Sequence, residues 1–246
     1  MKKITAIIPV YNAASYIERC IVSLQSQSYP DWEAIFVDDG SVDNSYDIIC
    51  SYAKNDDRIN VIRQMNAGAG LARNAGISKA TGEYLVFIDS DDIIRPDYFQ
   101  ELINRNEDVV FIDIDRVNED GKILKKEYMS RYKSLGKDDF IRYQMTGAIP
   151  WGGVRKAVKR NLIESNNIQF TSDIVGEEAL YSFQLLLCAK TYGFIEKPVY
   201  HYIQREQSLS RTKLEDPYAM LAPSYEHIID TQYITGGHAF FGHIQK

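Results

Sequence analysis

Five apolar residues, Tyr84 to Ile88, run directly into a group of three aspartates, Asp89, Asp91 and Asp92. Strand-forming residues followed by carboxylates indicate a buried strand whose carboxyl end carries oxygen ligands. In an open α/β sheet, ligands bind at the carboxyl ends of the strands. Hard divalent cations such as Mg²⁺ or Mn²⁺ bind one or two carboxylates together with substrate phosphates. The pattern predicts a metal-bridged diphosphate site; a polar turn that caps the strand is the alternative.

A second acidic pair, Asp38 and Asp39, follows the apolar run from Trp32 to Val37. Because ligands collect where the parallel strands of such a sheet end, we expect both acidic groups at one edge. One acidic strand end can arise by chance, whereas two at the same edge indicate a ligand site. We therefore predict that carboxylates from neighbouring strands meet around a single ligand.

Arg73 stands near the start of a helix predicted over residues 68–79. The run Gly68-Ala69-Gly70 begins like a dinucleotide-binding loop, but Arg73 replaces its third glycine, which argues against an NAD site. A guanidinium near a helix start can pair with a diphosphate. We interpret Arg73 as such a cation, and the alternative is an ordinary surface arginine on the helix.

Strand-like and helix-like patterns alternate over the first half of the chain. Strands are predicted over residues 4–10, 32–37, 59–62 and 84–88. Helices are predicted over residues 44–52 and 68–79, and from a capping box at Ser15–Glu18. The second half is predicted to add a strand over 108–113, a hairpin over 116–126, and helices over 138–145, 155–166 and 176–189. This order predicts a largely parallel sheet with helices on both faces.

The composition excludes several classes of protein. A formal net charge of −6 over 246 residues, without a long basic run, argues against nucleic-acid binding. The apolar runs are shorter than the roughly 18 residues that a membrane-spanning helix needs. The three cysteines lack metal-ligand spacing, as expected of reduced thiols, so we expect a cytoplasmic protein. Residues 214–246 hold an amphipathic pattern predicted to pack on the domain; peripheral contact with the inner face of the membrane is the alternative.

Five linked motifs in the first hundred residues resemble family 2 glycosyltransferases of the GT-A fold. They are Pro9–Asn12, Val37–Ser45, Asn66–Asn74, Gly82–Tyr84 and Asp89–Asp92. The resemblance implies an α/β fold with a mostly parallel central sheet and helices on both faces. It implies one GT-A catalytic domain over residues 1–213, with a nucleotide-sugar-binding half (1–100), an acceptor-side half (101–213) and an amphipathic or flexible tail (214–246).

The same resemblance implies an inverting, metal-dependent hexosyl- or N-acetylhexosaminyltransferase of surface-polysaccharide synthesis. Its donor would be a nucleotide-diphospho-sugar, typically UDP-linked, and its acceptor a hydroxyl of a glycan or lipid-linked molecule. Asp39 would meet the edge of the nucleobase. The other implied donor-binding residues are Pro9, Tyr11, Asn12, Asn66, Arg73, Asp89, Ser90 and Arg205.

The resemblance also implies a divalent cation, Mn²⁺ or Mg²⁺, bound by Asp91. His201 could approach this cation, but a lone histidine in an aromatic strand is more often packed than ligated. Trp151 lies in a turn-rich loop, where its ring could stack on an acceptor sugar. The alternative is a tryptophan that anchors the loop to the core.

Glu177 and Glu178 begin the predicted helix over 176–189, where the family usually has a glutamate followed by a catalytic aspartate. Glu178 takes the place of that aspartate, and we predict it as the base, with Glu177 as its orienting partner or the alternative base. Adjacent helical residues point about 100° apart, so both cannot face one acceptor hydroxyl. The helix dipole alone could account for both acids. Because Glu178 is one methylene longer than aspartate, a non-catalytic sugar-nucleotide-binding protein of the same fold is the alternative function.

Overall fold

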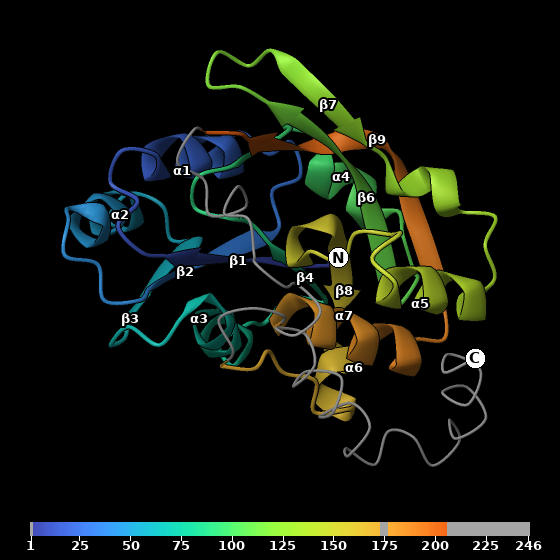
Figure 1. Cartoon of the computed structure of the whole chain (residues 1–246). Helices are drawn as coiled ribbons and strands as arrows, with labels where there is room; N and C mark the ends of the chain where they lie inside the picture. The colour runs from blue at the N-terminus through green and yellow to red at the C-terminus, as the bar shows by residue number, and fades with distance from the viewer. Residues whose placement is uncertain (1, 173–176, 206–246) are drawn as a thin grey trace, which may run out of the picture.

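The computed structural model describes residues 2–172 and 177–205, in which one mixed sheet forms the centre of the molecule (Figure 1). The strands are β1 (Ile4–Val10), β2 (Trp32–Asp38), β3 (Ile59–Arg63), β4 (Tyr84–Phe87), β5 (Ile93–Ile94), β6 (Val109–Val117), β7 (Ile123–Glu127), β8 (Lys156–Lys159) and β9 (Tyr192–Ile203). The α-helices are α1 (Ile17–Gln25), α2 (Ser45–Ala53), α3 (Ala69–Ile77), α4 (Tyr98–Ile103), α5 (Lys137–Met145), α6 (Arg160–Ser165) and α7 (Glu177–Cys188). The strand order is β3-β2-β1-β4-β8-β6-β9-β5, and β7 pairs with β6.

The first half of the sheet is parallel, as predicted. β1 lies between β2 and β4, so that Val10 pairs with Asp38 and Ile7 pairs with Phe87. Each of these strands is almost wholly buried, which explains why their sequences are nearly continuous apolar runs. The three strands end at one edge of the sheet, and the residues that follow them meet there.

The second half of the sheet is mixed, and one predicted helix is partly wrong. Residues 156–159 form β8, which pairs antiparallel with both β4 and β6, and helix α6 begins only at Arg160. Ala157 and Val158 are fully buried between those two strands. A short apolar run of this kind fits a strand or a buried helix equally well, and here pairing with the neighbouring strands decides.

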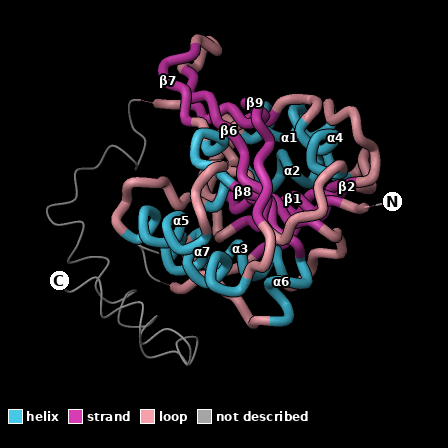
Figure 2. Tube along the Cα trace, turned by 90° about the vertical axis from the view of Figure 1, so that its right-hand side faces the viewer, coloured by secondary structure: helices cyan, strands magenta, loops and turns pink. Residues whose placement is uncertain are grey.

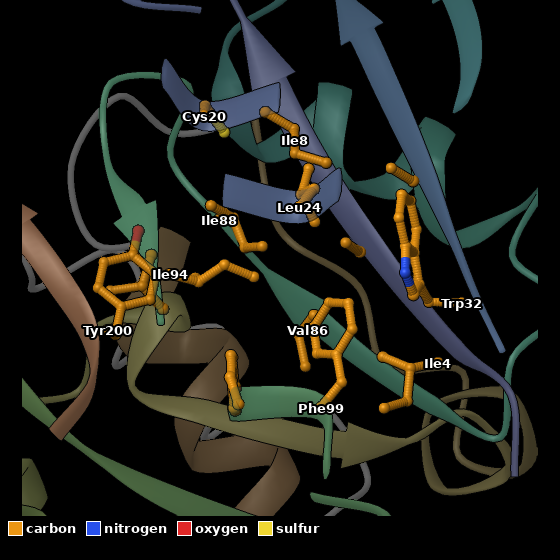
Figure 3. Packing of buried hydrophobic residues seen from close by; sticks show 14 of the residues in the cluster. Ile4, Ile8, Cys20, Leu24, Trp32, Val86, Ile88, Ile94, Phe99 and Tyr200 are labelled. Atoms are coloured by element: carbon orange, nitrogen blue, oxygen red, sulfur yellow. The ribbon is translucent and has the colours of Figure 1, made fainter. Parts of the chain in front are cut away.

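Helices cover both faces of the sheet, as predicted. One core cluster joins β1, β2 and β4 to α1 and α4, and it includes Trp32, Val86 and Phe99 (Figure 3). A second cluster on the opposite face joins Ile7 and Phe87 to α5, α6 and α7. Helix α3 packs beside it against β1 and β2. These two layers hold the strand ends in place.

Two local predictions can be compared directly with the structure. The hairpin is confirmed: β6 and β7 join through a turn over residues 118–122 and project from the body of the protein (Figure 2). The capping box is wrong, because no side chain caps α1, which begins at Ile17 after Tyr16. Instead, the backbone amides of Tyr16 and Ile17 both donate to the carbonyl of Ala13, and this turn sets the start of the helix.

Within the described residues, none of the helices has the length and apolar character needed to cross a bilayer. The tail predicted over 214–246 lies outside the described residues. The end of the domain predicted at residue 213 lies outside them as well, so these boundaries stay predictions.

Candidate donor and acceptor site

A cavity of about 1230 Å³ opens at the edge where β1, β2 and β4 end. It brings together every residue predicted to bind the donor and the predicted metal ligand. These are Pro9, Tyr11, Asn12, Asp39, Asn66, Arg73, Asp89, Ser90, Asp91 and Arg205. The prediction that both acidic groups share one edge is confirmed. Their individual roles in binding stay predictions.

The Asp39 carboxylate organises the loop that forms one wall of the cavity. It accepts hydrogen bonds from the backbone amides of Ala67 (2.9 Å) and Gly68 (2.8 Å), and from the Gln64 side chain (2.7 Å). Asp39 is 3% exposed. A carboxylate has about four acceptor positions, so one remains for a ligand. Asp39 therefore holds the loop at Gly68, which follows β3, whatever else it binds.

Asn12 ties the loop after β1 to the loop after β2. Its backbone has φ of 50°, a left-handed conformation in which asparagine is more common than most residues. Its side-chain oxygen accepts a hydrogen bond from the backbone amide of Val42 at 2.9 Å. The backbone amide of Asn12 donates to Ser41 Oγ at 3.0 Å. These bonds leave the neighbouring Tyr11 side chain 53% exposed at the cavity.

Asp89, Asp91 and Asp92 place carboxylate oxygens within 4.8 Å of one another. Asp92 is only 1% exposed, and each of its oxygens accepts a hydrogen bond, one from the Tyr200 hydroxyl (2.7 Å) and the other from the Ile203 amide (2.8 Å). Burial raises the pKa of Asp92 well above its usual range, and Asp89 and Asp91 add to this. Asp89 and Asp91 face the cavity instead. Asp92 is thus a structural tie between the loop after β4 and β9.

This tie gives a first testable outcome. Tyr200→Phe removes the hydroxyl that donates to Asp92 and accepts from the Asp89 amide (3.1 Å). We expect the free energy of unfolding in urea to fall by about 1–3 kcal/mol, because two buried polar groups lose a partner. Tyr143→Phe, at a 39% exposed tyrosine, is the control and should leave stability unchanged. Equal stability of both variants would show that the hydroxyl does not support the loop.

Arg205 closes the cavity on the side of the acidic group. Its guanidinium pairs with Asp91 and lies 3.6 Å from the centre of the Tyr16 ring. A cation over an aromatic face is attracted by the negative potential of the ring. Asp91 and Arg205 therefore neutralise each other in this structure.

Arg73 links the donor side of the cavity to the helix that carries the predicted base. One of its terminal nitrogens lies 3.1 Å from Asp89 and 3.2 Å from Glu178, and its side chain is only 6% exposed. Asp89 retains 32% exposure at the floor of the cavity. Desolvation nevertheless raises the pKa of Asp89 to about 6, against the opposing charge of Arg73. One buried guanidinium thus holds two acids from different elements.

Glu178 lies at the start of α7, against the glycines that follow Trp151. A Cβ at Gly153 would lie 3.2 Å from one carboxylate oxygen of Glu178, so a larger residue would crowd the acid. The Glu178 side chain is 27% exposed, which leaves it open to a ligand. The side chain of Glu177 lies outside the described part of the structure.

The family model described as "Glycosyl transferase family 2" matches residues 5–162. This chain belongs to glycosyl transferase family 2. EpsH of Bacillus subtilis, provisionally named a glycosyltransferase, is 34% identical over 208 residues, which are 81% of this chain and 60% of that protein. The uncharacterized glycosyltransferase EpsJ of Bacillus subtilis is 31% identical over 248 residues, 98% of this chain and 70% of that protein. The chain thus spans 60% of EpsH, a relative considerably longer than itself.

A crystal structure of S. aureus TarS in complex with UDP-GlcNAc superposes with a TM-score of 0.76. It is 24% identical in sequence and covers 94% of this chain and 67% of that one. At this identity the likeness establishes the fold alone. The GT-A fold expected from the sequence motifs is confirmed.

Three described residues predicted at the site of this family 2 chain, Glu178, His201 and Trp151, are not among those that line the cavity. Glu178 is joined to the cavity wall through its ion pair with Arg73. His201 is not part of the group of acids, and its β9 neighbour Tyr202 faces the cavity instead. Successive strand residues point to opposite faces, so His201 lies on the other side, where it is half-buried near Asp115. Trp151 is half-buried, with its ring 6.4 Å from that of Phe183, which fits an anchor in the core. Its role towards an acceptor is untested.

Sequence reasoning missed several residues at the site. The ring of Tyr16 packs against the Arg205 guanidinium. Asp92 and Tyr200 support the acidic loop. Residues 118–120 of the hairpin turn line the cavity. Each contact joins segments far apart in the chain, so no local spacing signals it. For Lys156, the available sequence signal was its apolar neighbours Val154, Ala157 and Val158. These three residues are buried in the structure.

Proposed function

We propose that this family 2 glycosyltransferase moves a sugar from a nucleotide-diphospho-sugar to a hydroxyl of a glycan or lipid-linked acceptor in surface-polysaccharide synthesis. The supporting observation is the position of Arg73, a residue of the cavity wall that forms ion pairs with both the donor-side acid Asp89 and Glu178. The binding of UDP-GlcNAc by TarS favours a UDP-linked donor, with a hexose or N-acetylhexosamine to transfer.

The acidic group fits a divalent cation, Mn²⁺ or Mg²⁺. Hard cations prefer carboxylate oxygens, and Asp91 and Asp89 direct theirs to the cavity, whereas those of Asp92 are used in structural hydrogen bonds. Asp91 would hold the ion, with Asp89 beside it. When bound, the cation would stabilise negative charge on the departing nucleotide diphosphate. His201, on the other face of β9, is not part of this proposal.

Glu178 acts as the base. It takes the proton from the acceptor hydroxyl while that oxygen attacks the anomeric carbon from the face opposite the nucleotide. The new bond to the acceptor oxygen forms as the bond to the diphosphate breaks, so one displacement inverts the anomeric configuration. Arg73 orients the Glu178 carboxylate through the 3.2 Å ion pair and holds it near the donor-side acid Asp89.

The nucleoside would lie near Pro9, Tyr11 and Asn12, with the base edge at the remaining acceptor position of Asp39. Tyr11 is exposed enough to cover a ring, and Asn66 lines the same wall. Ser90 and Arg205 lie beside the acidic group, where the diphosphate would be held. The structural hydrogen bonds of Asp39 leave its carboxylate able to accept one hydrogen bond from a uracil N–H.

The test uses the purified chain and a panel of UDP-, GDP- and dTDP-sugars. We expect the matching nucleotide to raise the melting temperature only when Mn²⁺ or Mg²⁺ is present, because binding to the folded state stabilises it. At a nucleotide concentration 100 times the dissociation constant, the gain is about 2.7 kcal/mol. An equal shift in the presence of a chelator would contradict the cation proposal. The absence of any shift across the panel would contradict donor binding.

A further inference from the structure

Lys156, on β8, is a buried lysine on the acceptor side of the site. It is 1% exposed. Its ammonium donates to Ser182 Oγ at 2.6 Å, to the carbonyl of Gly152 at 3.2 Å, and to the carbonyl of Trp151. An ammonium has three donors, so these contacts satisfy it. The lysine is thus fully engaged, with no donor left for a ligand.

These contacts fasten the loop at Trp151 to helix α7. Ser182 also donates to the Trp151 carbonyl at 2.6 Å, so the hydroxyl and the ammonium hold the same loop. Ser182 follows Glu178 by four residues, which places both on one face of the helix. The glycines at 152 and 153 let the loop approach the Glu178 carboxylate closely. Lys156 therefore sets how the loop and Glu178 face each other.

The electrostatic environment of Lys156 also indicates a link to Glu178. Desolvation lowers the pKa of Lys156 to about 7, which Glu178 opposes and Arg155 reinforces. These are the charged groups that act on the ammonium from α7 and from the turn before β8. A buried ammonium is costly compared with an apolar side chain of similar volume, so packing alone does not explain a lysine here. Its position between the Trp151 loop and Ser182 on α7, one helical turn from Glu178, does.

We propose that Lys156 is a positioning residue for sugar transfer, which fixes the Trp151 loop and the Glu178 carboxylate as one rigid acceptor-side unit. This inference rests on the proposed function, in which Glu178 is the base. Arg73 restrains Glu178 from the donor side and Lys156 from the acceptor side. The residue does not touch the reacting atoms and acts through Glu178 and the loop.

The first test is Lys156→Met, which keeps an unbranched side chain and removes the charge. We expect kcat for transfer to fall about 10- to 100-fold, because small misplacements of a reacting group cost that much. The KM for donor and the nucleotide-induced rise in melting temperature should stay within about twofold. Lys159→Met, on the same strand but paired with Asp108, is the matched control and should change none of these.

Two further variants guard against simple misfolding. Ser182→Ala removes one acceptor of the ammonium without emptying the pocket, and it should lower kcat in the same direction with normal donor binding. In a Glu178→Gln background, Lys156→Met should add little further loss, because both changes remove the same function. A full additional loss, or an unchanged kcat in Lys156→Met, would overturn the proposal. If Glu178→Gln itself stays active, the assignment of the base fails instead, and the two failures are distinguishable.

Discussion

Glu178→Gln is expected to lower the rate of sugar transfer by about 100- to 10,000-fold, the usual contribution of a positioned general base. The amide has the same shape as the acid and can still accept from Arg73, but it cannot take the proton of an acceptor hydroxyl. Donor affinity should therefore stay within about twofold, because the change removes an interaction made only in the transition state. Single-turnover transfer and nucleotide titration measure the two quantities separately.

The matched control is Glu164→Gln on α6, where the acid is 51% exposed and pairs with Arg160 away from the cavity. It should leave both quantities unchanged. Glu177→Gln is the informative companion, since this residue was the alternative base. Loss of activity in Glu177→Gln with retained activity in Glu178→Gln would reverse the assignment.

The first half of the fold could be predicted because its strands β1, β2 and β4 are buried on both faces. Such strands are nearly continuous apolar runs, and the turns after them carry the polar residues that form the site. Asp39 and Asp91 were placed at one edge from this rule, and the cavity contains both. The rule gives the place of a residue in the sheet, but not the partners of its side chain.

The second half was harder to predict because long-range pairing determines it. β8 has only four residues, and nothing in its sequence distinguishes it from the start of a helix. Antiparallel pairing with β4 and β6 buries it and directs Lys156 towards α7. The sequence pattern alone placed Lys156 in a helix predicted over residues 155–166. Its buried role follows only from the neighbouring strands.

Side-chain partners from distant segments also explain why individual site residues differ from their predicted roles. Asp39 was expected to meet a nucleobase, yet three hydrogen bonds commit it first to the loop at Gly68. His201 shares a strand with Tyr200, and the alternation of side chains directs the tyrosine to the acids and the histidine away from them. Sequence motifs identify which residues gather at the site, whereas the hydrogen bonds of each carboxylate decide which oxygens are left for ligands.

Asp91→Asn is expected to reduce metal-stimulated donor turnover by at least about 100-fold, because a neutral amide neither attracts a divalent cation as strongly nor balances its charge. Asp91 is the most exposed member of the group, at 40%, and it is paired with Arg205 in this structure. Mn²⁺ must therefore replace Arg205 at the Asp91 carboxylate. This exchange can be measured by Mn²⁺ titration without any donor.

Arg205→Met separates the two roles of the ion pair. Without the guanidinium, Asp91 is freed, and Mn²⁺ should bind about 2- to 5-fold more tightly in the absence of nucleotide, because a solvent-exposed ion pair contributes up to about 1 kcal/mol. Nucleotide diphosphate should bind more weakly to the same variant, because a cation that faces the phosphates is lost. Asp47→Asn on α2, an exposed acid away from the cavity, is the control for both measurements. If Asp91→Asn binds Mn²⁺ as tightly as the unmodified chain, Asp91 is not the ligand, and the release of Arg205 cannot be how the site accepts its cation.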